Sequence, residues 1–537
     1  MSRRSLARSA AIVAGCYVLS NVAGFVARLL INARFGAGPE QDAFRAAFVI
    51  PDLMFNVLAG GALASAFIPV YVGRLSQGET DAAWRLARAV MLIVFGALAA
   101  LALLAAAFAP ALIRHVVARQ FDPDQAALTA SLMRIMLIAT VIFGVSGLLM
   151  GVLQSNDAFL APAIAPSLYQ LGMILGATVL GGLGIHGLAA GVVIGALMHL
   201  AVQLPSLWFV LRLAFSVNSP RKEQDTRRAT QDAGRQTPNA PRSAIRGDLR
   251  QILMLMPPRM LGLGAVQINT LVNTTLASGL QGGVSAFNNA FAILVLPIAA
   301  IGQAVGTALF PAISAHAARE ERAQFAAAFT RALNAVIALS LPAAVGMIVL
   351  GRPLIRLLFE RGAFDARATE WVAFALALLA VGLPAHAALE LVTRAFYALR
   401  DSVRPAMLAV FSVAVNILLS VMLYSAFARA GWLPFGGPAL ANAIATILET
   451  LILYALLVRR AESLLPRAAW VAFGRHGLAA LTMGIIVWGW LRLAGDGAAA
   501  TLAALVIGAA SYFGLALALR SEEAQFAVGV LHDRFAR

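Results

Sequence analysis

Apolar runs of about 20 residues recur along nearly the whole chain, and this feature limits the possible folds more than any other. A run of that length spans the hydrocarbon core of a bilayer as an α-helix. The composition agrees, because 61% of the 537 residues are hydrophobic and only 12% are charged. A soluble globule of this composition would lack a polar surface. The alternating segments of a membrane β-barrel are absent from the sequence, so the sequence predicts an all-α integral membrane protein.

Fourteen membrane spans are predicted from these runs. They lie near residues 10–33, 43–73, 86–110, 131–154, 160–182, 185–211, 250–277, 285–315, 325–350, 368–398, 404–427, 437–458, 470–491 and 499–519. Placing both termini in the cytoplasm puts most arginines on the cytoplasmic side, as the positive-inside rule requires. The net charge of +16 is therefore explained by membrane topology, and nucleic acid is not an expected partner.

Residues 214–248 form a long polar stretch with many charges and several prolines. Such a composition predicts a flexible cytoplasmic linker. The linker separates an N-lobe of six spans at 1–213 from a C-lobe of six spans at 249–460. Residues 461–537 then hold two further spans and a short cytoplasmic tail. A regulatory or partner-binding role of the linker is an alternative interpretation.

Short matches recur 242 to 243 residues apart and indicate an internal repeat. AFRAAF at 43–48 corresponds to AFNNAF at 286–291. The matching prolines are Pro69 with Pro311 and Pro162 with Pro405. We therefore expect two homologous lobes of the same orientation around a central site, which is a transporter architecture. Shared helix composition is the alternative explanation of these matches.

Polar side chains recur inside the predicted spans, and polar groups in lipid mark functional sites by default. Spacings of seven and four residues predict one helix face for each of two groups in the N-lobe. The expected substrate-binding residues are Asn21, Arg28, Asn32, Asp42, Arg45, Asp52, Asn56, Arg259, Gln267, Asn269, Asn273, Asn288 and Asn289. Guanidinium groups bind phosphate through paired hydrogen bonds, so we expect a hydrated cavity between the lobes for a pyrophosphate or sugar head group. Pairing of Arg45 with Asp42 or Asp52, and interhelical bonding of the amides, are the alternatives.

The later spans carry a second polar set. Glu390 and Arg394 lie four residues apart and predict a structural ion pair. Asn416, Thr446 and Glu449 are candidates for ion coupling, by sodium or by a proton. The single cysteine excludes disulfides, and no metal-ligand spacing, phosphate-binding glycine loop or catalytic grouping occurs in the sequence. We therefore predict neither an enzyme nor a cofactor.

Six stretches of the sequence resemble the MurJ/MviN family. They are 35–51 (FGAGPEQDAFRAAFVIP), 60–69 (GGALASAFIP), 264–279 (GAVQINTLVNTTLASG), 302–311 (GQAVGTALFP), 358–365 (LFERGAFD) and 394–405 (RAFYALRDSVRP). The resemblance implies the multidrug/oligosaccharidyl-lipid/polysaccharide (MOP) exporter fold, with two six-helix lobes around a V-shaped cavity. It also implies two C-terminal helices that line a groove for a lipid tail.

The activity implied by the resemblance is the flipping of lipid II, the undecaprenyl-pyrophosphate-linked peptidoglycan precursor, between leaflets by alternating access. The implied location is the bacterial cytoplasmic membrane, with other cell-wall synthesis proteins as partners. The resemblance implies arginines at four positions, which in this sequence hold Asn21, Ala27, Phe55 and Ala292. We therefore expect the cations of Arg28, Arg45 and Arg259 to take their place.

Two other functions stay open at this point. One is a flippase for another undecaprenyl-linked saccharide, such as an exopolysaccharide unit, and the other is a non-transporting scaffold in cell-wall assembly. The source of energy is open as well, because a sodium ion and the membrane potential are both compatible with the sequence.

Overall fold

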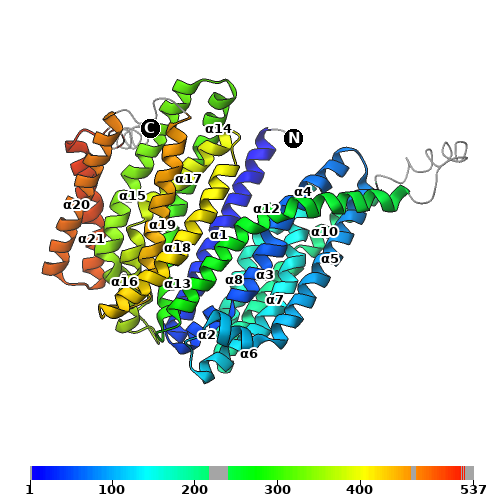
Figure 1. Ribbon diagram of the computed structural model, residues 1–537, viewed down its shortest axis with the longest axis horizontal. Helices are drawn as coiled ribbons and strands as arrows, with labels where there is room; N and C mark the ends of the chain where they lie inside the picture. The colour runs from blue at the N-terminus through cyan, green and yellow to red at the C-terminus, as the bar shows by residue number, and fades with distance from the viewer. Residues whose placement is uncertain (1–2, 217–239, 461–466, 522, 524, 526–537) are drawn as a thin grey trace, which may run out of the picture. The chain divides into compact units, whose positions relative to one another are not determined.

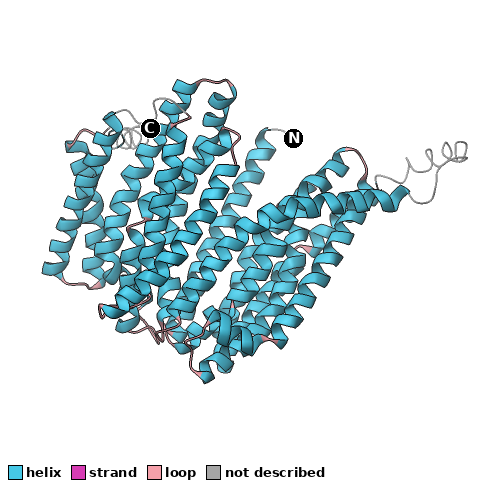
Figure 2. Cartoon of the chain, in the orientation of Figure 1, coloured by secondary structure: helices cyan, strands magenta, loops and turns pink. Residues whose placement is uncertain are grey.

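The computed structural model describes residues 3–216, 240–460, 467–521, 523 and 525. Helices make up almost all of this described part, which contains no strand (Figures 1 and 2). The chain divides into two compact units. The first unit comprises Met1–Phe35 and Pro39–Leu271, and the second comprises Gly36–Gly38 and Val272–Arg537.

The first unit is built from the helices of the N-terminal half and most of α12. Its elements are α1 (Arg3–Phe35), α2 (Pro39–Ala47), α3 (Val49–Met54), η1 (Phe55–Gly60), α4 (Gly61–Ser76), α5 (Thr80–Ala107), α6 (Ala109–Leu112), η2 (Ile113–Val117), α7 (Pro123–Ser155), α8 (Leu160–Thr178), η3 (Val179–Leu183), α9 (Ile185–Ala201), α10 (Leu204–Ser216) and α12 (Ala240–Ala277). The short elements η1 and η2 are π-helical and η3 is a 3₁₀-helix.

The second unit contains the remaining helices. These are α13 (Gly283–Pro297), the π-helical η4 (Ile298–Gln303), α14 (Ala304–Ala318), α15 (Arg322–Phe359), α16 (Ala366–Ala380), α17 (Leu383–Ala398), α18 (Val403–Arg429), α19 (Gly436–Val458), α20 (Arg467–Ala494) and α21 (Ala498–Ala518). The predicted lobe boundary at 249 therefore differs from the boundary between the units, which falls inside α12 after Leu271. Of the predicted linker, residues 217–239 lie outside the described residues, and α12 already begins at Ala240.

Eleven helices in the described part are long and apolar enough to cross a membrane, or up to twelve if α16 and α17, bent by 47°, form one span. The all-α membrane fold is thus confirmed, but the predicted count of fourteen is not. Two expected spans, 43–73 and 250–277, are missing from these candidates within the described residues. The first is divided because α2 ends at Ala47 and a π-helical turn separates α3 from α4.

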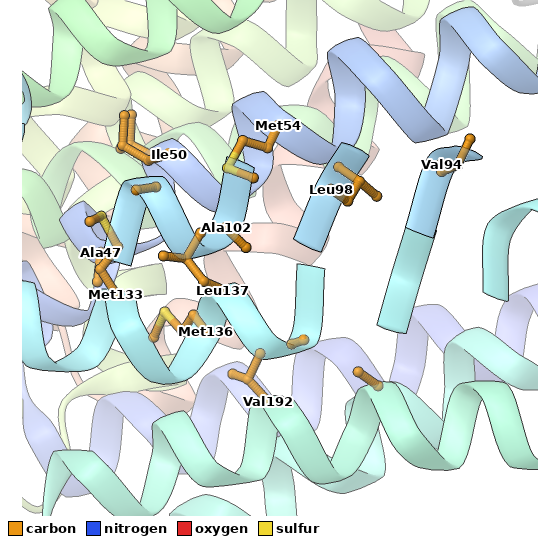
Figure 3. Close-up of a cluster of buried hydrophobic side chains, with 14 of the residues drawn as sticks. Ala47, Ile50, Met54, Val94, Leu98, Ala102, Met133, Met136, Leu137 and Val192 are labelled. Carbon is orange, nitrogen blue, oxygen red and sulfur yellow. The ribbon is translucent and has the colours of Figure 1, made fainter. Parts of the chain in front are cut away.

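The apolar core of the first unit explains how α5 and α7 pack (Figure 3). Val94, Leu98 and Ala102 on α5 lie four residues apart and therefore share one face of the helix. They are buried with Met133 and Leu137 of α7, among other apolar side chains of this cluster. Apolar residues at helical spacing thus pack α5 against α7.

Both units repeat the same local structures at a common offset. The π-helical turns begin at residues 55 and 298, and the aspartate caps stand at 122 and 365. The carboxylate of Asp122 accepts a hydrogen bond from the Gln125 amide, as Asp365 does from the Ala368 amide, both at 2.8 Å. Such caps satisfy amides that the first helical turn leaves without partners. These shared features support the internal repeat that the sequence predicts.

In each unit, a polar cluster links two helices at corresponding places. In the first, Ser146 of α7 bonds the His199 ring at 2.7 Å, and the Gln203 amide donates to the Ser146 hydroxyl at 2.8 Å. In the second, His386 of α17 bonds Asn442 and Thr446 of α19, at 3.1 and 3.2 Å. Positions 199 and 203 correspond to positions 442 and 446 at the repeat offset. The histidine of the cluster lies on α9 in the first unit and on α17 in the second. Hydrogen bonding of this kind holds membrane helices together.

Candidate functional site

A cavity of about 300 Å³ lies inside the first unit, among α3, α7, α8 and α9. Most of its lining is apolar, and the Phe143 ring makes edge-to-face contacts with three neighbours. The ring centroids of Tyr169, His199 and Phe55 lie 4.9, 5.3 and 5.9 Å from that of Phe143. Asp52 supplies the one acidic side chain of the lining. The cavity thus joins an aromatic wall to a carboxylate.

A cationic cluster adjoins this cavity. Arg45 on α2 interacts electrostatically with Arg28 of α1, and with Tyr169 and Asp52 of the cavity lining. The Arg45 Nε is buried and has no hydrogen-bond partner among the described residues. Arg45 and Asp52 attract each other electrostatically, and the pairing of Arg45 with Asp42 or Asp52 stays an alternative interpretation. Two guanidinium groups beside one carboxylate leave a net positive charge, with a donor available to an anion.

The other substrate-binding candidates of the N-lobe have more varied surroundings than a single shared helix face would give. Asn32 is fully buried and accepts a hydrogen bond from the Gln41 amide at 2.7 Å, which ties α1 to α2. Asp42 is also fully buried, whereas Asn21 is exposed. The Asn56 amide donates to the Asp52 backbone carbonyl at 2.9 Å. Phe48, between α2 and α3, keeps a right-handed helical backbone, so a shared face for Arg45 and Asp52 stays a prediction, whereas Asn56 lies in the π-helical turn η1.

The candidates on α12 and α13 also separate into several environments. Asn273 is buried and accepts a hydrogen bond from the Ser420 hydroxyl at 3.3 Å. Asn288 donates to its own helix at the Val284 carbonyl, and Asn289 is fully buried. For the others, Gln267 is partly exposed, Asn269 has a buried Oδ1 without a hydrogen-bond partner, and the side chain of Arg259 lies outside the described residues. The hydrated cavity between the lobes therefore stays a prediction.

The three candidates for ion coupling belong to different hydrogen-bonded groups. Asn416 accepts from Ser420 at 3.0 Å, and Thr446 bonds His386 at 3.2 Å. Glu449 is hydrogen-bonded to Ser412. Since each side chain has its own partner, the described contacts do not bring the three together around one ion. Glu390 and Arg394 form an ion pair at 2.8 Å, as their spacing predicts.

The positions at which the family resemblance implies arginines have clear physical surroundings. Ala27 is fully buried, so the chain offers no room there for a long cationic side chain. Phe55 lines the cavity and packs against Phe143, which makes this wall apolar. Ala292 is partly exposed on α13. The cationic cluster of this chain therefore rests on Arg28 and Arg45.

Sequence reasoning missed Tyr169, Phe143 and the role of His199 in this site. All three are aromatic side chains within predicted spans, and each reaches the cavity from a helix far away along the chain. Hydropathy alone gives no sign of that convergence. A polar aromatic residue inside an apolar run is the signal that points to Tyr169 and His199.

The profile of the family described as "Lipid II flippase MurJ" matches residues 31–507. The probable lipid II flippase MurJ of Rhizobium meliloti (strain 1021) is 31% identical over 465 residues, covering 85% of this chain and 81% of that protein. The lipid II flippase MurJ of Burkholderia cenocepacia is 28% identical over 529 residues, covering 95% and 97%.

Solved structures agree on the fold. A lipid II flippase MurJ in an inward closed conformation matches with a TM-score of 0.75 and 22% identity, over 95% of this chain and 98% of that one. An inward-facing multidrug resistance MATE family transporter of the MOP superfamily matches with a TM-score of 0.64 and 16% identity, over 83% and 95%. The fold is therefore that of the MOP superfamily. With the family profile covering most of its length, the chain belongs to the MurJ family of lipid II flippases.

Proposed function

We propose that this protein flips lipid II from the inner to the outer leaflet of the bacterial cytoplasmic membrane, as a transporter and not as an enzyme. Membership of the MurJ family and the many apolar helices support this function. The observation that carries it in this chain is the cationic cluster of Arg28 and Arg45, with its buried donor beside the cavity. A pyrophosphate is the part of lipid II that such a cluster suits.

Each part of the substrate has a matching environment in this proposal. The polyprenyl tail stays in the hydrocarbon of the bilayer, where it costs no desolvation. The pyrophosphate is held by Arg45 and Arg28, which replace the water that a dianion loses on leaving the aqueous phase. The head group then crosses while the protein alternates between access to one side and access to the other.

Both termini lie in the cytoplasm in this proposal, because that orientation puts most arginines on the cytoplasmic side. Other cell-wall synthesis proteins are then the natural partners, since they make lipid II on one side and consume it on the other. Movement of a guanidinium charge through the whole field would contribute about 2.3 kcal/mol per 100 mV, so the membrane potential is one candidate source of energy and a sodium ion is the other.

Complementation tests the proposal directly. The protein is expressed in cells whose own flippase can be shut off, and lipid II exposed in the outer leaflet is measured. We expect the wild type to restore exposure. Arg45→Ala should lower it roughly ten- to a hundredfold, because one or two charge-assisted hydrogen bonds are lost. Arg119→Ala is the matched control, since Arg119 is exposed in the turn after η2 and donates to the nearby His115 backbone carbonyl.

Membrane insertion of every variant is checked by fractionation. Normal exposure with Arg45→Ala would show that the cationic cluster does not hold the substrate. Absent exposure with the inserted wild type would instead favour another undecaprenyl-linked saccharide as the substrate.

A further inference from the structure

In the second unit, α20 and α21 pack on α15 through an apolar cluster. Its buried members include Leu350 of α15 and Met483 and Val487 of α20. The contact is close, because a Cβ atom added to Gly484 would lie 2.6 Å from the Val345 Cγ1. Any polar group buried in this contact must therefore find its hydrogen-bond partner inside the protein.

One such group is a backbone carbonyl that α15 itself leaves free. Pro342 lies inside α15 and has no amide hydrogen, so the carbonyl of Ala338, four residues earlier, loses its partner within the helix. The Tyr512 hydroxyl of α21 donates to this carbonyl instead. Tyr512 is only 4% exposed, so water has little access to that bond. The single proton of the hydroxyl is thus used in the contact with α15.

A buried histidine extends this contact to the segment after α21. His476 of α20 is 1% exposed, and its Nδ1 lies 2.9 Å from the Tyr512 hydroxyl oxygen. Because that hydroxyl donates its proton to Ala338, its oxygen accepts from His476, and Nδ1 must carry a hydrogen. The Nε2 atom lies 3.1 Å from the Glu523 carboxylate and 3.3 Å from the Ser521 hydroxyl oxygen. The Ser521 hydroxyl donates to the same carboxylate oxygen at 2.8 Å.

These donor and acceptor roles determine the protonation of the His476 ring. Hydrogen bonding to His476 lowers the pKa of Glu523 to about 2, so this carboxylate is ionised at neutral pH and only accepts. The Ser521 proton is used in its bond to Glu523, so its oxygen accepts from Nε2 as well. Nε2 therefore carries a hydrogen, as Nδ1 does, and the ring is an imidazolium.

Few other charges lie around this ring. Among the described residues hydrogen-bonded to His476, Glu523 is the one carboxylate, α21 contributes the Tyr512 hydroxyl, and α15 contributes only a backbone carbonyl to the network. Arg475 and Arg520 flank the network, and both are exposed. The Arg475 guanidinium donates to the Arg520 carbonyl at 3.5 Å. His476 lies in the candidate span Ala469–Ala494, where an unpaired charge is costly, so the imidazolium depends on its single carboxylate.

We propose that His476 is a proton-binding site that controls how the segment after α21 (Ser521, Glu523 and Gln525) is attached to the second unit. With the proton bound, Nε2 donates to Glu523 and the segment is held. Without it, Nε2 presents a lone pair to the carboxylate, which repels it, while Nδ1 keeps its hydrogen bond to Tyr512. Alkaline pH therefore releases the segment and leaves α20 and α21 packed on α15. This proton site acts independently of the lipid that is transported.

The first measurement is the protonation of His476, by ¹⁵N NMR of labelled histidine rings in the full-length protein in lipid nanodiscs. His476→Gln identifies the signals by their loss. We expect hydrogens on both ring nitrogens at about pH 6 and on Nδ1 alone at about pH 9. Glu523→Gln should make the ring neutral even at about pH 6, because a buried cation then lacks its anion. Glu370→Gln is the matched control, since Glu370 is exposed and pairs with Arg352 at 3.3 Å.

The second measurement is the hydrogen-exchange protection of the Ser521 and Gln525 amides, which donate to the carbonyls of Ala516 and Ser521. Protection factors are used because they remove the direct effect of pH on exchange. Protection in the wild type should fall about tenfold between about pH 6 and about pH 9, through loss of one charge-assisted hydrogen bond. In Glu523→Gln it should be low at both values. Amides within α20 should keep their protection, because the contact through Tyr512 persists.

Each outcome decides the matter. Loss of the Nε2 hydrogen together with loss of protection at Ser521 supports the proton site. A His476 ring that is already neutral at about pH 6 overturns it, since the contact with Glu523 then needs no proton. Protection that stays constant while the ring loses its proton also overturns it, and His476 is then a structural contact only.

Discussion

The contact between α8 and α9 allows one prediction to be worked out in detail. The two helices meet at glycines, and a Cβ atom added to Gly172 would lie 2.2 Å from the Gly195 Cα. Real Cβ atoms almost never approach a neighbour closer than 3.0 Å, and both atoms here belong to backbone or are fixed to it. Gly172→Ala must therefore push the helices apart. Such overpacking costs about 1–3 kcal/mol.

Part of this cost is offset in the helix itself. Alanine is the better helix former by about 1 kcal/mol, so the net loss in free energy of unfolding should be about 0–2 kcal/mol. Gly96→Ala on α5 is the matched control, because a Cβ atom there has no neighbour within 4 Å. The control should show no loss. The two glycine-to-alanine substitutions should therefore change the free energy of unfolding in opposite directions, or by clearly different amounts.

The free energy of unfolding can be measured in bicelles by steric trapping of the purified protein. Because α8 carries Tyr169 and α9 carries His199, Gly172→Ala should also reduce lipid II exposure in cells. Equal stability of Gly172→Ala and Gly96→Ala would refute the reasoning, since it would mean that α8 and α9 do not touch through these glycines.

Two further predictions concern the ends of helices. Arg74 donates to both carboxylate oxygens of Asp248, at 3.0 and 2.9 Å, and so holds the start of α12 to the end of α4. Asp248→Ala should speed amide hydrogen exchange in that part of α12 about fivefold, and the exchanged pair Arg74→Asp with Asp248→Arg should restore protection. Hydrogen bonding to the buried His476 lowers the pKa of Glu523 from 4.5 to about 2, so its ionised form stabilises the folded chain. Glu523→Gln should therefore lower the thermal midpoint above pH 4.5, and the difference should shrink as the pH falls toward about 2. A difference that grows on acidification would contradict this sign.

Much of the fold follows from the sequence because one physical requirement dominates it. Each span must satisfy its backbone inside a helix and cover it with apolar side chains, which leaves a strong signal in hydropathy. Pairs of side chains close together in the sequence are predictable as well, because the geometry of the helix is fixed. Glu390 and Arg394 meet because four residues complete about one helical turn.

The site was harder to predict because it depends on breaks and on distant contacts. The chain leaves the regular helix between α2 and α3 and again at η1, where hydropathy shows no change. Asn56 lies within η1, where the spacing of a regular α-helix no longer applies. The cavity then needs Tyr169 from α8, and no local pattern reports which helix will pack there. Asn32 likewise found its partner, Gln41, across a turn.

Two of the three described π-helical turns, η1 and η4, have a consequence for the history of the chain. A π-turn arises when one extra residue enters an α-helix, which disturbs hydrogen bonding and is seldom kept without a use. Here the turns at Phe55–Gly60 and Ile298–Gln303 occupy matching places in the two units. One insertion before a duplication explains both turns more simply than two independent insertions at matching places. We infer that the insertion came first and that duplication copied it, so the ancestral half-length protein already carried this irregular helix.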